Sequence, residues 1–214
     1  MGELVLIRHG ETEWSRSGQH TGWTDLPLTA HGEQQARALR PLLAGRRIAR
    51  VLASPLGRAQ RTAELAGLTP DRVKFETTPD LHEWDYGGYE GVSTDEIHRT
   101  RPDWYLWTDG VAPGPPDHPG ETVEEVGARV DRVLAYVGDA LADDRGGDRG
   151  DDWGDDRGGD VVLVAHSHVL RVLTARRLGL PASAGALFRL DTAALSTLGL
   201  EHGRPVVTGW NIHP

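Results

Sequence analysis

The 214-residue sequence contains no cysteine. This absence excludes disulfide bonds, a thiolate nucleophile and cysteine-ligated zinc, so any covalent catalysis must use another side chain. The sequence also lacks an apolar run near the roughly 20 residues that span a bilayer. Its first apolar run, residues 4–7, is too short for the hydrophobic region of a signal peptide. We therefore expect a cytoplasmic protein with no membrane partner.

Basic residues are outnumbered by acidic ones, which gives a formal net charge of −9. A negative balance argues against general nucleic-acid binding. More than half of this charge lies in residues 143–160, which hold eight Asp, three Arg, six Gly and one Trp. We expect this low-complexity run to form a solvated surface loop. Because the apolar segment after it must return to the same sheet, residues 1–214 are expected to form a single domain.

The hydrophobic pattern alternates between two periods. Continuous apolar runs at 4–7 and 161–165 are typical of strands buried on both faces, and the segment 50–54, apolar at 51–53, is predicted to form another buried strand. Apolar residues recur at helical spacing between and after them. The expected helices cover 29–43, 57–66, 94–100, 102–108, 121–141 and 169–178, and the further strands cover 73–76, 193–200 and 205–210. This alternation predicts an α/β fold with a mostly parallel sheet that ends in an antiparallel hairpin.

Polar residues that follow the predicted strands form the first candidate site. Arg8 and His9 follow the first strand, Arg58 comes shortly after the second, and His166 follows residues 161–165. Ligands bind at the carboxyl ends of parallel strands, so we expect these side chains to meet. Arginine suits phosphate oxygens, and a neutral histidine can act as a nucleophile. The set lacks acidic ligands at metal spacing, so we expect no metal.

A reaction at phosphorus also needs a general acid for the leaving alcohol. Glu83 is the best candidate, because it is flanked by Trp84 and lies near glycines that let other backbone approach. A lone histidine at a strand end is more often structural. For His168 we leave open whether the ring lines the pocket or packs beneath the following helix.

The segment RHGETEW at residues 8–14 resembles the RHG signature of the histidine phosphatase superfamily, in its phosphoglycerate mutase-like branch. Further segments follow in that family's order: TGWTDLPLT at 21–29, SPLGRAQRTA at 54–63, EWDYGGYEG at 83–91, GET at 120–122 and AHSH at 165–168. The RHG motif alone would be weak evidence of kinship, but several motifs in the same order argue against a chance match. The resemblance implies a three-layer α/β/α sandwich and an enzyme without metal or cofactor.

The resemblance also implies roles for individual residues. His9 would become phosphohistidine, with Glu83 as the acid and later the base that activates water. Arg8, Arg58 and His166 would clamp the phosphoryl oxygens. Substrate-binding roles are expected for Gly10, Ser15, Thr21, Gly22, Tyr86, Ser167 and His168. Two of these depart from the family, because Ser15 stands where Asn is common and Ser167 stands where Gly is usual.

The RHG core does not separate phosphatases from mutases. A mutase of this family uses several basic residues after the acid-bearing loop, whereas residues 92–120 contain only Arg99 and Arg101. We therefore favour a phosphomonoesterase acting through phosphohistidine on a small phosphorylated sugar or similar metabolite. The alternatives are phosphoglycerate mutase-type transfer and a catalytically silent binding member, although the intact catalytic set argues against the latter. A homodimer is left open.

Overall fold

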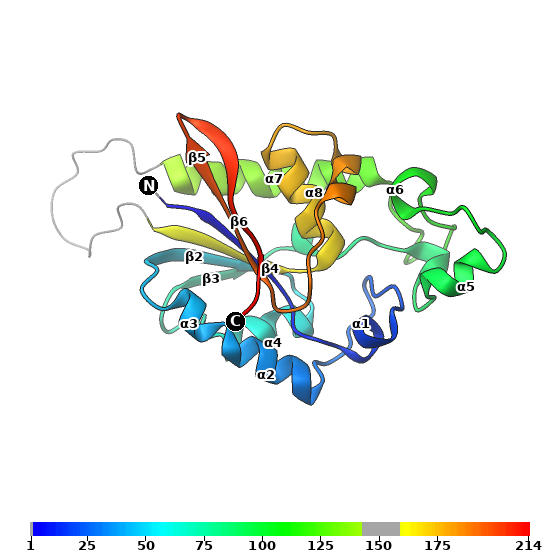
Figure 1. Ribbon diagram of the computed structural model, residues 1–214, viewed down its shortest axis with the longest axis horizontal. Helices are drawn as coiled ribbons and strands as arrows, with labels where there is room; N and C mark the ends of the chain where they lie inside the picture. The colour runs from blue at the N-terminus through cyan, green and yellow to red at the C-terminus, as the bar shows by residue number, and fades with distance from the viewer. Residues whose placement is uncertain (1, 143–158) are drawn as a thin grey trace, which may run out of the picture.

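The computed structural model describes residues 2–142 and 159–214, and its described part is built on a six-stranded β-sheet (Figure 1). The strands are β1 (Leu4–Arg8), β2 (Ile48–Ala53), β3 (Lys74–Thr77), β4 (Asp160–Ala165), β5 (Leu195–Glu201) and β6 (Arg204–Ile212). Their order is β3-β2-β4-β1-β5-β6. The first four are parallel, whereas β5 and β6 are antiparallel to their neighbours. The predicted mostly parallel sheet with an antiparallel end is therefore confirmed.

Helices connect these strands, and their bounds refine the sequence prediction. The α-helices are α1 (Glu13–Ser17), α2 (Ala30–Ala38), α3 (Arg40–Leu43), α4 (Gly57–Leu65), α5 (Thr94–His98), α6 (Leu106–Asp109), α7 (Val123–Ala142) and α8 (Ser167–Arg177). The 3-10 helices are η1 (Pro79–Leu81), η2 (Gly87–Tyr89) and η4 (Ala182–Leu187). The helix expected over 102–108 forms only at its end, because Asp109 binds the Tyr105 N–H and starts the helix there. Short α1 was not predicted.

The sheet buries a core on each face. Leu4 and Leu6 of β1 join one apolar cluster with α7 and α8, whereas Val5 and Ile7 join the other with α3 and α4. All four side chains are fully buried. Successive strand residues point to opposite faces, so a continuous apolar run serves both cores. Figure 1 shows α2 and α4 on one side of the sheet and α7 and α8 on the other. The predicted α/β/α sandwich is confirmed.

Most of the acidic run, residues 143–158, lies outside the described residues. The sequence prediction extended this loop to residue 160. It was wrong at that end, because Asp160 is the first residue of β4. The Asp160 carboxylate accepts the Glu3 N–H at 2.8 Å and pairs with Arg46 at 2.7 Å. These bonds fix Asp160 to the start of β1. Among the described helices, none has the length and apolar character needed to cross a membrane.

Candidate active site

The carboxyl ends of β1 and β4 bring two histidines together. The backbone N–H of His9, which follows β1, donates to the Ala165 carbonyl at the end of β4 at 2.9 Å. His166 is the next residue after Ala165, and the His9 and His166 ring centroids lie 5.1 Å apart. Both rings are buried. The structure thus brings together the two histidines that the sequence placed after separate strands.

The state of the His9 ring follows from its hydrogen bond. Its Nδ1 lies 2.7 Å from the Gly10 carbonyl oxygen, which can only accept, so Nδ1 carries the hydrogen. The neutral ring then keeps its lone pair on Nε2. Burial, followed by the charges of Arg58 and Arg8, lowers the pKa of His9 well below its usual value. His9 is therefore a neutral imidazole, as the predicted role of nucleophile requires.

Arg58 holds the second histidine and a loop at once. Its Nε donates to His166 Nδ1 at 3.2 Å, so the His166 hydrogen is on Nε2, which lies 2.8 Å from Ser54 Oγ. Its Nη2 donates to the Gly22 carbonyl at 2.6 Å and to the Thr21 carbonyl at 3.3 Å. The expected substrate residues Thr21 and Gly22 therefore present carbonyl oxygens to Arg58, and their contact with substrate stays a prediction.

Arg8 carries a donor that the protein does not satisfy. Its Nη1 donates to the Leu190 carbonyl at 2.7 Å. Its Nε is buried and has no hydrogen-bond partner among the described residues. A buried donor without an acceptor costs free energy, and a guanidinium suits the oxygens of a phosphoryl group. Arg8 thus fits the predicted phosphate-clamping role.

Glu83 is 3% exposed and faces the start of α8. Its Oε1 accepts the N–H groups of Trp84 and Val169, both at 2.9 Å, and its Oε2 accepts the His168 N–H at 3.0 Å. His168 and Val169 belong to the first turn of α8, where N–H groups lack partners within the helix. The helix that follows His166 therefore orients the predicted acid.

His168 packs among aromatic side chains, and its role as a pocket residue stays a prediction. The Tyr86 hydroxyl lies 2.6 Å from His168 Nδ1. Burial lowers the pKa of His168 well below its usual value and raises that of Tyr86, so this hydrogen bond joins two neutral groups. The ring packs against Trp107 at 5.4 Å, yet its side chain is 20% exposed. The Tyr86 hydroxyl and Trp107 thus hold the ring beside Glu83, whose Oε2 accepts the His168 N–H.

The remaining predicted substrate residues are placed less directly. The Gly10 N–H donates to Thr62 at 3.0 Å. The Ser15 hydroxyl completes the capping box of α1, accepting the Thr12 N–H at 2.9 Å and donating to the Thr12 carbonyl at 3.0 Å. Binding a phosphate would require Ser15 to exchange that bond. Ser167 begins α8 and is not among the described residues with a positive φ, so its backbone does not require glycine.

Sequence reasoning missed Arg129. This residue of α7 is 6% exposed and binds the backbone of the segment that carries Glu83. One signal was available, because position 129 falls on the helical stripe formed by Val126, Val130 and Val133. A charged residue on an apolar stripe is almost never buried without a partner.

The comparisons with known proteins cover the whole molecule. The sequence model described as the histidine phosphatase superfamily (branch 1) matches residues 4–213. The chain belongs to the histidine phosphatase superfamily. An acid phosphatase of Mycobacterium tuberculosis is 38% identical over 99% of this chain and 94% of that relative. A sedoheptulose 1,7-bisphosphatase of Saccharomyces cerevisiae is 33% identical over 82% of this chain and 67% of that protein.

A solved structure supports the same family and fold. The product of open reading frame Rv3214 from Mycobacterium tuberculosis superposes with a TM-score of 0.83 and 35% identity, covering 99% of this chain and 98% of that one. The predicted family and enzyme class are thereby confirmed: this histidine phosphatase is a phosphoric monoester hydrolase of the kind that acts on small phosphorylated molecules.

Proposed function

We propose that this histidine phosphatase hydrolyses the phosphomonoester of a small metabolite, a sugar phosphate or similar compound, through a phosphohistidine on His9 and without a metal ion. The observation that carries the proposal is the state of His9. Its Nδ1–H is held by the Gly10 carbonyl at 2.7 Å, which leaves the Nε2 lone pair for phosphorus. Its lowered pKa keeps the ring unprotonated in mildly acidic solution.

In the first step, His9 Nε2 forms a bond to phosphorus as the bond to the leaving alcohol oxygen breaks. Glu83 gives that oxygen a proton. Each carboxylate oxygen has two acceptor positions, and Oε1 uses both for backbone N–H groups. Oε2 takes one backbone bond, so it is the oxygen that carries the transferable proton. Acid–base help of this kind contributes about 10²–10⁴-fold in rate.

In the second step, water attacks phosphorus while the Glu83 carboxylate takes a proton from it. The bond between phosphorus and Nε2 breaks, inorganic phosphate leaves, and His9 returns to its neutral form. Fixed positive charges near the transferring group stabilise the charge that develops. Arg8, with its unsatisfied Nε, and the buried Arg58 supply these charges in our proposal.

A mutant of the nucleophile tests the mechanism. We expect the wild type to hydrolyse p-nitrophenyl phosphate in excess EDTA and to be inhibited by vanadate. His9→Ala should lower kcat on the order of 10³-fold or more, because no covalent intermediate forms. His31→Ala, which changes an exposed histidine of α2, is the matched control and should keep full activity. Activity that needs a metal, or an active His9→Ala variant, would contradict the mechanism.

A substrate panel tests the substrate class. The names of the acid phosphatase and bisphosphatase relatives, together with few basic residues in 92–120, support a phosphatase rather than a mutase. We expect free phosphate from sugar mono- or bisphosphates. Phosphoglycerates and nucleotides complete the panel. Formation of a phosphoglycerate isomer without free phosphate would identify a mutase instead.

A further inference from the structure

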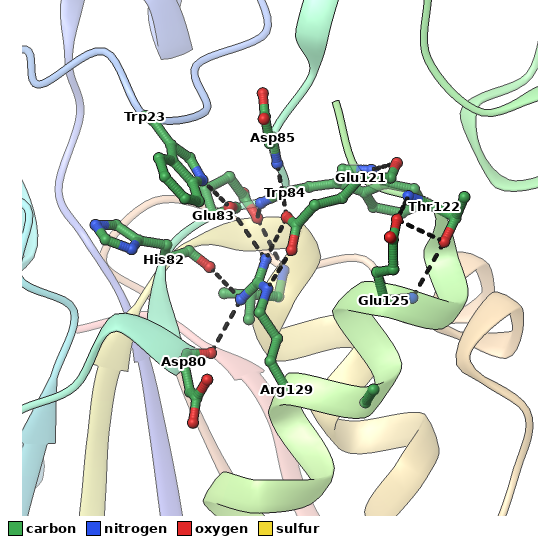
Figure 2. Close-up of polar contacts among 12 residues, drawn as sticks. Trp23, Asp80, His82, Glu83, Trp84, Asp85, Glu121, Thr122, Glu125 and Arg129 are labelled. Atoms are coloured by element: carbon green, nitrogen blue, oxygen red, sulfur yellow. Dashed lines mark hydrogen bonds and ion pairs between the residues drawn. The ribbon is translucent and has the colours of Figure 1, made fainter. Parts of the chain in front are cut away.

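The starting observation is a buried, fully satisfied guanidinium. Arg129 Nε and Nη2 donate to the two carboxylate oxygens of Glu121 at 2.8 and 3.0 Å. Nη1 donates to the carbonyls of Asp80 and His82 at 2.9 and 2.7 Å, and Nη2 also donates to the Glu83 carbonyl at 3.1 Å. Figure 2 shows Arg129 surrounded by these acceptors. All five guanidinium donors are thus used, three of them on backbone carbonyls between 80 and 83.

Burying the Arg129 guanidinium costs free energy that packing alone does not require. A buried ion pair loses hydration, and well-packed apolar residues of similar volume often stabilise a core equally well. Arg129 lies on the apolar stripe of α7, where valine precedes and follows it at helical spacing. Arg129 therefore contributes directed hydrogen bonds. Only a guanidinium can bind three carbonyls of one irregular segment while a carboxylate balances its charge.

Glu121 secures the other end of the same segment. Its Oε2 accepts the Asp85 N–H at 2.9 Å, and its own N–H donates to the Asp85 carbonyl at 3.0 Å (Figure 2). Glu121 is itself held at the start of α7, where Thr122 and Glu125 exchange hydrogen bonds as a capping box. The pair of Glu121 and Arg129 thus holds the backbone on both sides of Glu83, from 80 to 85.

We infer that Glu121 and Arg129 are positioning residues for the Glu83 carboxyl group, an inference that rests on the acid–base role proposed for Glu83. The backbone of Glu83 is bound from α7, and its carboxylate is bound by the N–H groups of His168 and Val169 at the start of α8. Two helices thereby set the place from which the proton is delivered. A general acid loses rate when its geometry is not held.

The inference predicts a dependence on the leaving group. Phenolate needs a proton as it leaves, whereas 2,4-dinitrophenolate does not. The parameter kcat/KM reports formation of the phosphoenzyme, so water activation in the second step does not affect it. Arg129→Lys keeps the charge but loses the fork. Glu121→Gln keeps the shape but loses the charge, and it carries the test if Arg129→Lys fails to fold.

We expect both variants to lower kcat/KM for phenyl phosphate by about 10–100-fold and for 2,4-dinitrophenyl phosphate by about threefold or less. Glu83→Gln should show the same selective loss, and adding Arg129→Lys to it should cause no further loss, because the two act through one group. Arg176→Lys is the matched control. It weakens another bidentate pair, with Asp131 at 2.9 and 2.8 Å, that also involves α7, and it should leave the ratio of the two substrates unchanged.

Each other outcome has a distinct meaning. Equal losses on both substrates, or a further loss in the Glu83→Gln background, would assign the pair a structural role only and overturn the inference. The inference also fails if Glu83→Gln leaves the substrate ratio unchanged while His9→Ala is inactive, because then Glu83 is not the acid. An active His9→Ala variant would instead remove the proposed function itself.

Discussion

At the scale of single residues, one ring nitrogen decides what each active-site histidine can do. A backbone carbonyl accepts from His9 Nδ1, so Nε2 holds the lone pair. In His166 the situation is reversed, because Nδ1 accepts a hydrogen from Arg58 and the ring hydrogen on Nε2 faces Ser54 Oγ. Two neutral imidazoles of one residue type thus differ at Nε2, which holds the lone pair in His9 and the hydrogen in His166.

For His168 we expect the same state as for His166, with the Tyr86 hydroxyl donating to Nδ1 and the ring hydrogen on Nε2. Tyr86→Phe leaves His168 Nδ1 without its donor, and an unsatisfied buried acceptor costs about 1–3 kcal/mol. We expect kcat/KM to fall about tenfold and the ¹⁵N chemical shifts of the His168 ring to move toward a mixture of tautomers. Tyr136→Phe is the control, since that hydroxyl also makes a 2.6 Å bond, to Glu76, on a helix away from the site. Unchanged ¹⁵N shifts in Tyr86→Phe would contradict the assignment.

The residue scale also marks the limit of sequence reasoning. His9 and His166 were predictable because each follows a continuous apolar strand, and Arg8 and Glu83 because they lie in recognisable motifs. The commitment of Ser15 to a helix cap was not predicted, since the sequence showed only that its hydroxyl can donate. Arg129 was missed because the three backbone carbonyls that it binds lie more than 45 residues away in the chain.

At the scale of elements, buried strands were easier to predict than short helices. β1 and β4 lie between two cores, so their apolar runs are continuous and their limits are clear. α6 is set by one side-chain bond from Asp109, which periodicity does not reveal. Hydrophobic periodicity reflects burial. Short helices in the loops around the site show little of this periodicity.

The junction of β1 with α2 gives an element-scale prediction. A Cβ at Gly10 would lie 2.4 Å from the Gly32 carbonyl oxygen in the first turn of α2. We expect Gly10→Ala to lower the free energy of unfolding by about 1–3 kcal/mol, because the backbone must shift. The same shift moves the carbonyl that orients His9, so kcat should fall as well. Urea unfolding and p-nitrophenyl phosphate kinetics measure the two effects.

Gly138→Ala is the control for that substitution. Gly138 lies in α7, and among the described residues no atom lies within 4 Å of a Cβ added there. Alanine there should raise the free energy of unfolding by about 0.5–1 kcal/mol, since glycine is unfavourable inside a helix. If Gly10→Ala behaves like Gly138→Ala, the close approach between the loop and α2 does not constrain the site.

At the scale of the whole molecule, net charge and local charge have opposite signs. The chain carries −9, yet its reaction site gathers the buried guanidinium groups of Arg8 and Arg58 around His9. Much of the negative charge lies in 143–160, and only the end of that run takes part in the described fold. A phosphate site is therefore compatible with an acidic protein, because field strength in a buried site depends on the nearest fixed charges.

The same buried rings predict how stability depends on pH. Burial lowers the pKa of five histidines: His9, His20, His82, His166 and His168. Histidine in the unfolded chain has a pKa near 6.5. Below that pH the unfolded chain binds protons that the native state does not bind, so the free energy of unfolding falls as the pH falls. Each ring contributes up to about 1.4 kcal/mol per pH unit in that window. Net charge predicts the opposite, because acidification toward the pI of 5.5 reduces repulsion.

We expect the histidines to prevail, because their effect is local and unscreened whereas repulsion among surface charges is screened by salt. The free energy of unfolding in urea should therefore decrease between pH 6.5 and 5.5. His166→Asn, which retains an acceptor for Arg58, should show a shallower decrease by the share of one ring. Equal slopes in the wild type and in His166→Asn would mean that this ring takes up its proton in the native state, and would contradict the neutral form on which the proposed mechanism depends.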